Sequence, residues 1–292
     1  MKVHEFGGQW TEEKLNRIKK YLDAYMKIFT TNIRASRLHT IYVDAFAGTG
    51  YRNLKKTDKT VMPLFEDNDA LAFQKGSARI ALESDPPFNE YIFVEKSPEY
   101  TGELEKLRLQ FPQCDNIRIV MEDANSFLQS WCIQKDWRFN RAVVFLDPYG
   151  MAVDWKTIEL IAQTRAVDLW LLFPLGQAVN RILTKDGPPE KSWEERLTKF
   201  FGSDDWKDAF YRENKQGDMF DTSKRSLVKE ANFVSIGNYF INRLKTVFAK
   251  VAENPLPLRN SKNVPIFLLC FAAANPKGSS TAVKIAQHLL EN

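Results

Sequence analysis

Short apolar segments that alternate with helical ones constrain the fold of this chain more than any other feature. Segments rich in β-branched and aromatic residues are predicted as strands, at residues 40–44, 91–94, 117–121, 142–146 and 167–173. Residues spaced as on one face of a helix predict helices at 11–29, 74–83, 98–109, 126–134 and 155–164. Such alternation is typical of a parallel sheet covered by helices. We therefore expect an α/β fold of the Rossmann-like kind, with a mostly parallel sheet and flanking helices.

The C-terminal part of the chain follows a different pattern. Residues 187–230 are polar and aromatic, and they are predicted as a helical insertion or small subdomain. The core is then expected to comprise residues 1–186 and 231–292, with later elements at 233–245 (helix), 247–251 and 265–273 (strands) and 281–290 (helix). The aromatic residues of the insertion are more typical of a subdomain core than of a base-stacking surface; they include Trp193, Trp206 and Phe210.

Composition limits the class of protein. The chain has 292 residues, of which 44% are hydrophobic and 27% charged, as in ordinary globular proteins. It has no apolar run of the roughly 18 residues that a membrane helix needs, and its first residues lack the apolar region of a secretory signal. We therefore expect a cytoplasmic protein with no membrane partner. The net charge of +4 is compatible with a nucleic-acid partner without requiring one.

The cysteines and histidines give no metal-binding pattern. Cys114, Cys132 and Cys270 are far apart, no Cys-x-x-Cys pair occurs, and the histidines are equally scattered. We expect no metal site, and three reduced thiols that are mostly buried.

The first candidate site follows the first predicted strand. There the chain reads Asp-Ala-Phe-Ala-Gly-Thr-Gly, and glycines at such a place allow a tight turn and close approach of the backbone to a ligand. The Asp44 carboxylate is suited to accept a hydrogen bond from an ammonium group. A simple turn of small residues is the alternative interpretation. The candidate cofactor-binding residues of this segment are Asp44, Phe46, Ala47, Gly48, Thr49 and Gly50.

Acidic residues also follow the second and third predicted strands. Glu95, followed by Lys96, ends the second strand, and one carboxylate there can accept from both hydroxyls of a ribose. Asp123, followed by Ala124, comes after the third strand and is suited to accept from an adenine amino group. Taken singly, each has a plain alternative: Glu95 as a solvated strand end, and Asp123 as the N-cap of the next helix. The cap and the adenine contact are compatible with each other.

The fourth predicted strand leads into Asp147-Pro148-Tyr149-Gly150. The Asp147 carboxylate and the Pro148 carbonyl can hold an amino group, and Tyr149 can stack on a planar substrate, with Phe173 as a further stacking candidate. We therefore predict Asp147, Pro148 and Tyr149 as catalytic residues. A Pro-Tyr-Gly turn without function is the alternative.

The four strand ends are more informative together than singly. Ligands of open α/β sheets bind beyond the carboxyl ends of the strands, where these four segments would meet. A nicotinamide dinucleotide fits less well, since Asn53 stands where that fingerprint has a small residue and Asp44 would lie near a pyrophosphate.

At these positions the chain resembles class I methyltransferases, especially the nucleic-acid group with Asp-x-Phe-x-Gly-x-Gly. Over nearly its whole length it resembles the three-Cys-motif partner family of bacterial proteins. That resemblance rests on Trp10 with Lys14, Tyr21 and Tyr25, DAFAGTG, Gly76-Ser77, Ala81-Leu82, FVEKSP, FLDPYGM with Trp155, Leu172-Phe173-Pro174 and FAAANPKG. One departure is that Asp147-Pro148-Tyr149 lacks the second proline usual in amino-methyltransferases of nucleic acids.

The resemblance implies a methyltransferase fold and S-adenosylmethionine as cofactor. It also implies a three-Cys-motif protein, encoded nearby, as a candidate partner. We expect an enzyme that methylates a nitrogen, for which a nucleic-acid base is one candidate acceptor. The alternative is a non-catalytic or partner-dependent module that keeps the cofactor site or only the fold.

Overall fold

The computed structural model describes residues 9–47, 76–213 and 227–291. The predicted turn residues Gly48, Thr49 and Gly50 lie outside the described residues, as does the start of the helix predicted at 74–83. Residues 76–82 are helical.

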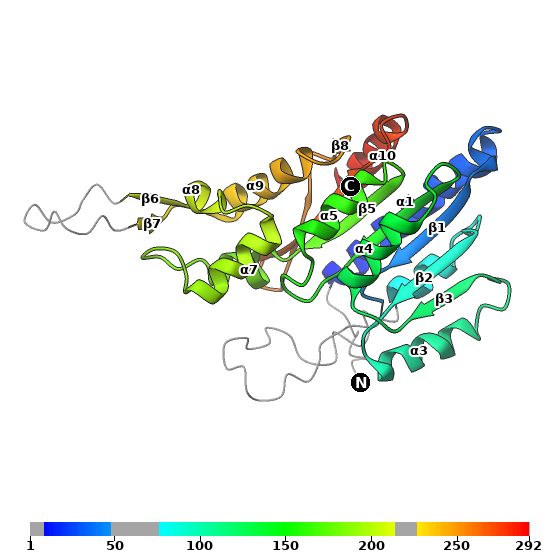
Figure 1. Cartoon of the computed structure of the whole chain (residues 1–292), viewed down its shortest axis with the longest axis horizontal. Coiled ribbons are helices and arrows are strands. Elements are labelled where there is room, and N and C mark those ends of the chain that lie inside the picture. Colours follow the sequence, from blue (N-terminus) through cyan, green and yellow to red (C-terminus); the bar gives the residue numbers. More distant parts are fainter. Residues whose placement is uncertain (1–8, 48–75, 214–226, 292) are drawn as a thin grey trace, which may run out of the picture.

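A mostly parallel sheet forms the centre of the molecule, and the fold is Rossmann-like (Figure 1). The strand order is β3-β2-β1-β4-β5-β10-β8, and β9 pairs with β10. Strands β1 to β5 are parallel, whereas β10 runs antiparallel to its neighbours. The strands are β1 (His39–Asp44), β2 (Glu90–Val94), β3 (Ile117–Val120), β4 (Asn140–Leu146), β5 (Val167–Phe173), β8 (Lys250–Val251), β9 (Leu256–Arg259) and β10 (Pro265–Ala273).

Helices cover both faces of this sheet because its strands are apolar on both sides. Ile41 and Val43 of β1 pack into the cluster formed with α4, α5 and α9, whereas Tyr42 between them packs into the cluster formed with α1, α3 and α10. Figure 1 shows α4 and α5 in front of the sheet and the blue α1 behind it. These helices are α1 (Gln9–Thr31), α3 (Pro98–Arg108), α4 (Ala124–Gln134), α5 (Trp155–Gln163), α9 (Phe233–Lys245) and α10 (Ser279–Glu291).

The segment predicted as an insertion packs on the same face as α4 and α5. Its described residues form two helices and also a two-stranded antiparallel ribbon, which the prediction of a helical segment did not include. Trp206 and Phe210 are fully buried, as predicted for core residues of this segment. A short π-helix and α6 connect β5 to it. The elements are η2 (Leu175–Val179), α6 (Asn180–Ile182), α7 (Lys191–Phe201), α8 (Trp206–Phe210), β6 (Tyr211–Glu213) and β7 (Leu227–Lys229).

The three cysteines are unpaired, and Cys132 and Cys270 are buried. Among the described residues, no group of His, Cys, Asp or Glu side chains is arranged to hold a metal ion. Within the same part of the chain, every helix is too short or too polar to cross a bilayer.

Helix α1 is held on the sheet by a buried polar contact as well as by apolar packing. The Tyr21 hydroxyl donates to Oδ2 of Asp168 on β5 over 2.7 Å, and both residues are buried. Burial raises the pKa of Asp168 to about 7, while the bond from Tyr21 and the nearby Arg141 oppose the shift. Folding therefore favours the protonated carboxyl, and this contribution to stability is lost as pH rises from about 4 towards 7.

We expect Asp168→Asn to remove that loss. From pH 5 to pH 8, the wild type should lose roughly 1–3 kcal/mol of its free energy of unfolding relative to Asp168→Asn. The reason is that only the wild type has to bury a carboxylate charge at the higher pH. Chemical denaturation at the two pH values measures the difference. The exposed Asp186→Asn serves as control and should follow the wild type. A difference that does not change with pH would contradict this account of Asp168.

Candidate functional site

The carboxyl ends of β1, β2 and β4 meet at one edge of the sheet. The Ala45 amide donates to the Phe145 carbonyl over 3.2 Å, and the Ala47 amide donates to the Val94 carbonyl over 3.1 Å. The strand order reverses between β1 and β4, since β2 and β3 lie on one side of β1 while β4 and β5 lie on the other. In α/β proteins, ligands bind beyond the strand ends at such a reversal, which is here called the β1–β4 switch point.

Asp44 ends β1 at this switch point and is fully buried. Its Oδ1 accepts from the Phe46 amide over 3.2 Å, whereas Oδ2 is buried and has no hydrogen-bond partner among the described residues. Burial raises the pKa of Asp44 to about 7; a hydrogen bond from Ser77 opposes the shift, and the nearby Asp147 adds to it. A buried carboxylate oxygen of this kind is suited to accept a hydrogen bond from a cationic group.

Asp147, at the end of β4, forms an ion pair with Lys14 of α1. Lys14 Nζ lies 2.9 Å from Oδ2 of Asp147, and the lysine side chain is 0% exposed. Its ammonium also lies 5.7 Å from the centre of the Trp10 ring and 5.5 Å from that of Phe145. Burial lowers the pKa of Lys14 to about 8, while Asp147 opposes the shift. Burial raises the pKa of Asp147, and Lys14 opposes that shift in turn.

Sequence analysis assigned no role to Lys14. A signal was present, because Lys14 lies on the α1 face that also carries Ile18, Tyr21 and Tyr25, which are buried. A lysine within an apolar helix face must find a buried partner or reach solvent. What the sequence does not indicate is the partner, which is 133 residues away.

Glu95 is also buried at this edge of the sheet, whereas the adjacent Lys96 is exposed. The Glu95 amide donates to the Val120 carbonyl over 2.9 Å, which places the residue beside the end of β3. Its Oε1 accepts from the Ser97 amide over 2.5 Å. The carboxylate is thus oriented by the residue that precedes α3, and the prediction of Glu95 as a solvated strand end is wrong.

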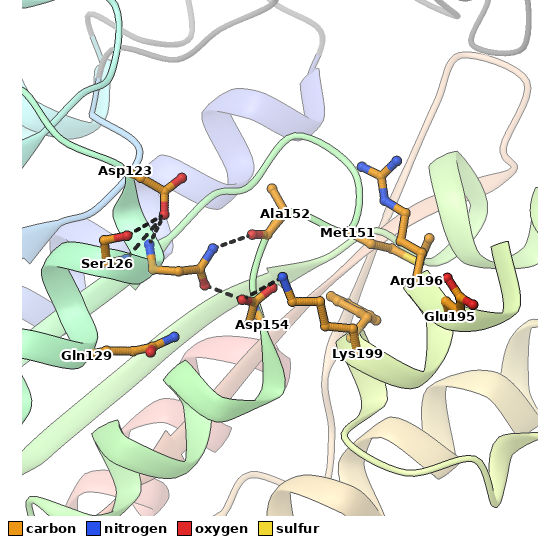
Figure 2. Close-up of a pocket in the computed structure, with 11 residues that line it drawn as sticks. Asp123, Ser126, Gln129, Met151, Ala152, Asp154, Glu195, Arg196 and Lys199 are labelled. Carbon is orange, nitrogen blue, oxygen red and sulfur yellow. Dashed lines mark hydrogen bonds and ion pairs between the residues drawn. The ribbon is translucent and has the colours of Figure 1, made fainter. Parts of the chain in front are cut away.

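Asp123 caps α4 and lines a cavity of about 620 Å³. Its Oδ1 accepts from the amides of Asn125 (3.1 Å) and Ser126 (3.2 Å), which agrees with the predicted N-cap. Figure 2 shows the other oxygen pointing away from the helix. Ala124, the first residue of α4, is buried. The predicted cap therefore leaves one carboxylate oxygen available at the cavity.

The cavity lies between α4, the loop after β4, and α7. Met151 and Phe200 supply apolar surface, while most other lining residues are polar or charged. Figure 2 shows Lys199 reaching from α7 to Asp154, where Nζ and Oδ2 are 3.0 Å apart. The lining residues are Asp123, Asn125, Ser126, Gln129, Met151, Ala152, Asp154, Glu195, Arg196, Lys199 and Phe200.

Asn125 joins two walls of this cavity, namely α4 and the loop after β4. Its amide nitrogen donates to the Ala152 carbonyl over 2.8 Å. Its Oδ1 accepts from the Asp154 amide (2.9 Å) and from the Thr157 hydroxyl (2.8 Å). Sequence analysis did not single out Asn125, although it directly follows the predicted Asp123-Ala124 pair.

The remaining predicted residues follow Asp147. Pro148 is buried and Tyr149 is partly buried. Burial raises the pKa of Tyr149, and the cationic groups of Arg181 and Arg196 oppose the shift. These arginines, from α6 and α7, are exposed, so the surface near Tyr149 carries positive charge.

Phe173 does not face the site. It is fully buried, and its ring centre lies 4.2 Å from that of Phe240 and 5.8 Å from that of Phe200, in stacked arrangements. The prediction that Phe173 stacks on a substrate is therefore wrong, because α7 and α9 cover the ring.

The structure brings Asp44, Lys14 and Asp147 together at the β1–β4 switch point and places Asp123 at the cavity. Among the described residues, the cavity lining does not include Asp44, Glu95 or Asp147. The assignment of these side chains to one ligand stays a prediction.

No protein-family model matches the chain, and no curated protein matches its sequence. Solved structures that resemble it include an rRNA methylase from Streptococcus thermophilus (12% identity, 73% of this chain and 93% of that chain, TM-score 0.29). Another is M. jannaschii TYW2 in complex with AdoMet (14% identity, 77% and 74%, TM-score 0.29). A conserved hypothetical protein of Streptococcus pyogenes is similar at 16% identity (55% and 82%, TM-score 0.31). Similarities this low do not establish a shared function, which has to be argued from the site itself.

We expect Asn125→Ala to destabilise the protein by roughly 1–3 kcal/mol. The substitution leaves the Asp154 amide and the Thr157 hydroxyl without their acceptor. Urea denaturation measures the change. Asn242→Ala, at an exposed position of α9, is the matched control and should stay within about 0.5 kcal/mol of the wild type. Equal stability of the two variants would mean that the Asn125 bonds do not hold the walls together.

Proposed function

We propose that this protein is an S-adenosylmethionine-dependent methyltransferase that acts on a nitrogen atom. The observation that carries the proposal is the buried Asp44 carboxylate at the β1–β4 switch point, whose Oδ2 has no hydrogen-bond partner among the described residues. A carboxylate in that state is costly to bury unless a ligand supplies a donor. The cofactor's ammonium group is such a donor.

The other acidic groups match the rest of the cofactor in order. Glu95, buried at the end of β2, would accept from the ribose hydroxyls, and the outward oxygen of Asp123 would accept from the adenine amino group. The cavity of about 620 Å³ beside Asp123 has the size of a small-molecule pocket. Phe46, Ala47, Lys96 and Ala124 are the other predicted contact residues, together with Gly48, Thr49 and Gly50, which lie outside the described residues.

The acceptor would bind beside Asp147, Pro148 and Tyr149. When bound, the cofactor supplies a methyl group on a sulfonium, whose C–S bond breaks as the N–C bond forms. The Asp147 oxygen not bonded to Lys14, together with the Pro148 carbonyl, would orient the acceptor amine, and Tyr149 would stack on its ring. Positioning of this kind supplies most of the catalysis of an in-line displacement. The acceptor proton leaves to water.

A nucleic-acid base is the acceptor class we favour. Arg181 and Arg196 lie near enough to Tyr149 to affect the pKa of its hydroxyl, and cationic groups beside a stacking aromatic suit a phosphate-bearing substrate. A base within a duplex would have to be flipped out of the stack. Membership of the three-Cys-motif partner family, a cytoplasmic location in a bacterium, and a nearby-encoded three-Cys-motif protein as partner remain part of this proposal.

A second candidate is a non-catalytic or partner-dependent module that binds the cofactor without turnover. The observation that favours it is the engagement of Asp147 by Lys14, which occupies one oxygen of the predicted catalytic carboxylate. Incubation with labelled cofactor and pools of RNA, DNA and protein distinguishes the two candidates. Label transfer supports the enzyme, whereas cofactor binding without transfer, together with a stably co-purifying partner, supports the module.

We expect the purified protein to bind S-adenosylmethionine, and two substitutions to weaken binding at pH 8. Asp44→Asn should lower affinity about 10- to 100-fold, because the ammonium loses a charged acceptor. Asp123→Asn should lower it about tenfold without loss of stability, since asparagine also caps helices but presents a donor to the adenine amino group. Calorimetric titration measures both.

Asp115→Asn is the matched control. Asp115 is exposed in the loop before β3, at the opposite end of that strand from Asp123, so its substitution should leave affinity unchanged. A folded wild type that does not bind the cofactor would refute the proposed function for the isolated chain.

A further inference from the structure

We propose that Lys14 is a positioning residue of the cofactor site: by pairing with Asp147, it makes Asp44 the carboxylate that receives a cationic ligand. This inference rests on the proposed function. It extends that function to helix α1, which precedes the sheet and carries none of the predicted cofactor-binding or catalytic residues.

The geometry supports such a role. Asp44 is paired in register with Phe145, and Asp147 follows Phe145 by two residues, so the two residues lie at the same edge of the sheet, at the ends of neighbouring parallel strands. Lys14 reaches them from the α1 side of the sheet, where its ammonium is fully enclosed and bonded to Asp147 over 2.9 Å. The Trp10 and Phe145 rings lie within 6 Å of it and limit its movement.

The charges explain why the lysine matters. Two carboxylates buried side by side cannot both ionise unless a cation compensates them. Lys14 lies close to Asp147 and farther from Asp44. One cation and two carboxylates carry a net charge of −1 when all three groups are ionised. That remaining charge is located on Asp44, whose Oδ2 has no hydrogen-bond partner among the described residues.

Besides Lys14 and Asp147, two polar side chains lie near Asp44, namely Ser77 and Tyr42. A hydrogen bond from Ser77, in the helical residues 76–82, lowers the pKa of Asp44, and Asp44 raises the pKa of Tyr42 on its own strand. Neither carries a charge near neutral pH. Within the described part of the chain, Lys14 lowers the pKa of Asp44 and Asp147 raises it. Removal of the Lys14 charge should therefore raise the pKa of Asp44, and removal of the Asp147 charge should lower it.

Cofactor affinity measured as a function of pH tests the inference. The cationic ammonium binds the ionised carboxylate, so affinity should fall about tenfold per pH unit below the pKa of Asp44, which is about 7. Lys14→Met keeps the length of the side chain without its charge and should move the midpoint of this fall to higher pH. Asp147→Asn should move it to lower pH. The double variant should return it towards the wild type.

Calorimetric titration of S-adenosylmethionine between pH 5.5 and 9 gives each midpoint, and thermal melting without cofactor confirms that each variant is folded. A purely structural ion pair would lower affinity at every pH and leave the midpoint in place, and that result would overturn the inference. If Lys14→Met does not fold, Asp147→Asn alone still has to shift the midpoint downwards. Absence of binding by the folded wild type at any pH would instead refute the cofactor assignment.

Discussion

Burial of the central strands on both faces determines where polar chemistry occurs in this molecule. β1, β4 and β5 are covered by α1 and α10 on one face and by α4, α5 and the later helices on the other, so the side chains in the middle of these strands are hydrophobic. An unpaired polar group within such a layer costs free energy. Polar side chains are therefore concentrated where strands begin and end, and parallel strands bring their carboxyl ends to a single edge.

This arrangement creates an electrostatic problem at the point where the strand order reverses. Asp44 and Asp147 lie at the ends of neighbouring strands, where Asp44 is fully buried and the Asp147 side chain is 11% exposed. Helix α1 supplies Lys14 to one of them. The other is left with a buried oxygen that a cationic ligand can satisfy, which links the packing of α1 to the binding capacity of a site formed by β1 and β4.

Much of this architecture follows from local sequence. The bounds of β5 (Val167–Phe173) and α9 (Phe233–Lys245) agree with those predicted, because an apolar run broken only by Asp168 and a clear helical spacing are strong signals. β9 and the β6–β7 ribbon were not predicted, since short strands take their stability from the partner strand rather than from their own residues. Within the site, the N-cap at Asp123 was predicted correctly, because such a cap depends only on the next three residues.

Long-range contacts account for what could not be predicted. A strand-end aromatic such as Phe173 is equally compatible with a substrate platform and with a core, and only the placement of α7 and α9 decides between them. Lysine side chains are almost always exposed, so the position of Lys14 on a helix face does not by itself indicate an ion pair with Asp147, after β4.

The two polar contacts of α1 differ in a way that separates structure from function. Tyr21 meets Asp168 near the start of β5, at the edge of the sheet remote from the predicted site, where the contact only fixes the helix. Lys14, about two turns earlier in α1, meets Asp147 at the opposite edge. A buried ion pair adds little net stability, because desolvation of both charges offsets most of their attraction. Helix docking therefore gives no sufficient reason for a charge at Lys14, whereas control of the ionisation of two carboxylates at the proposed ligand site does.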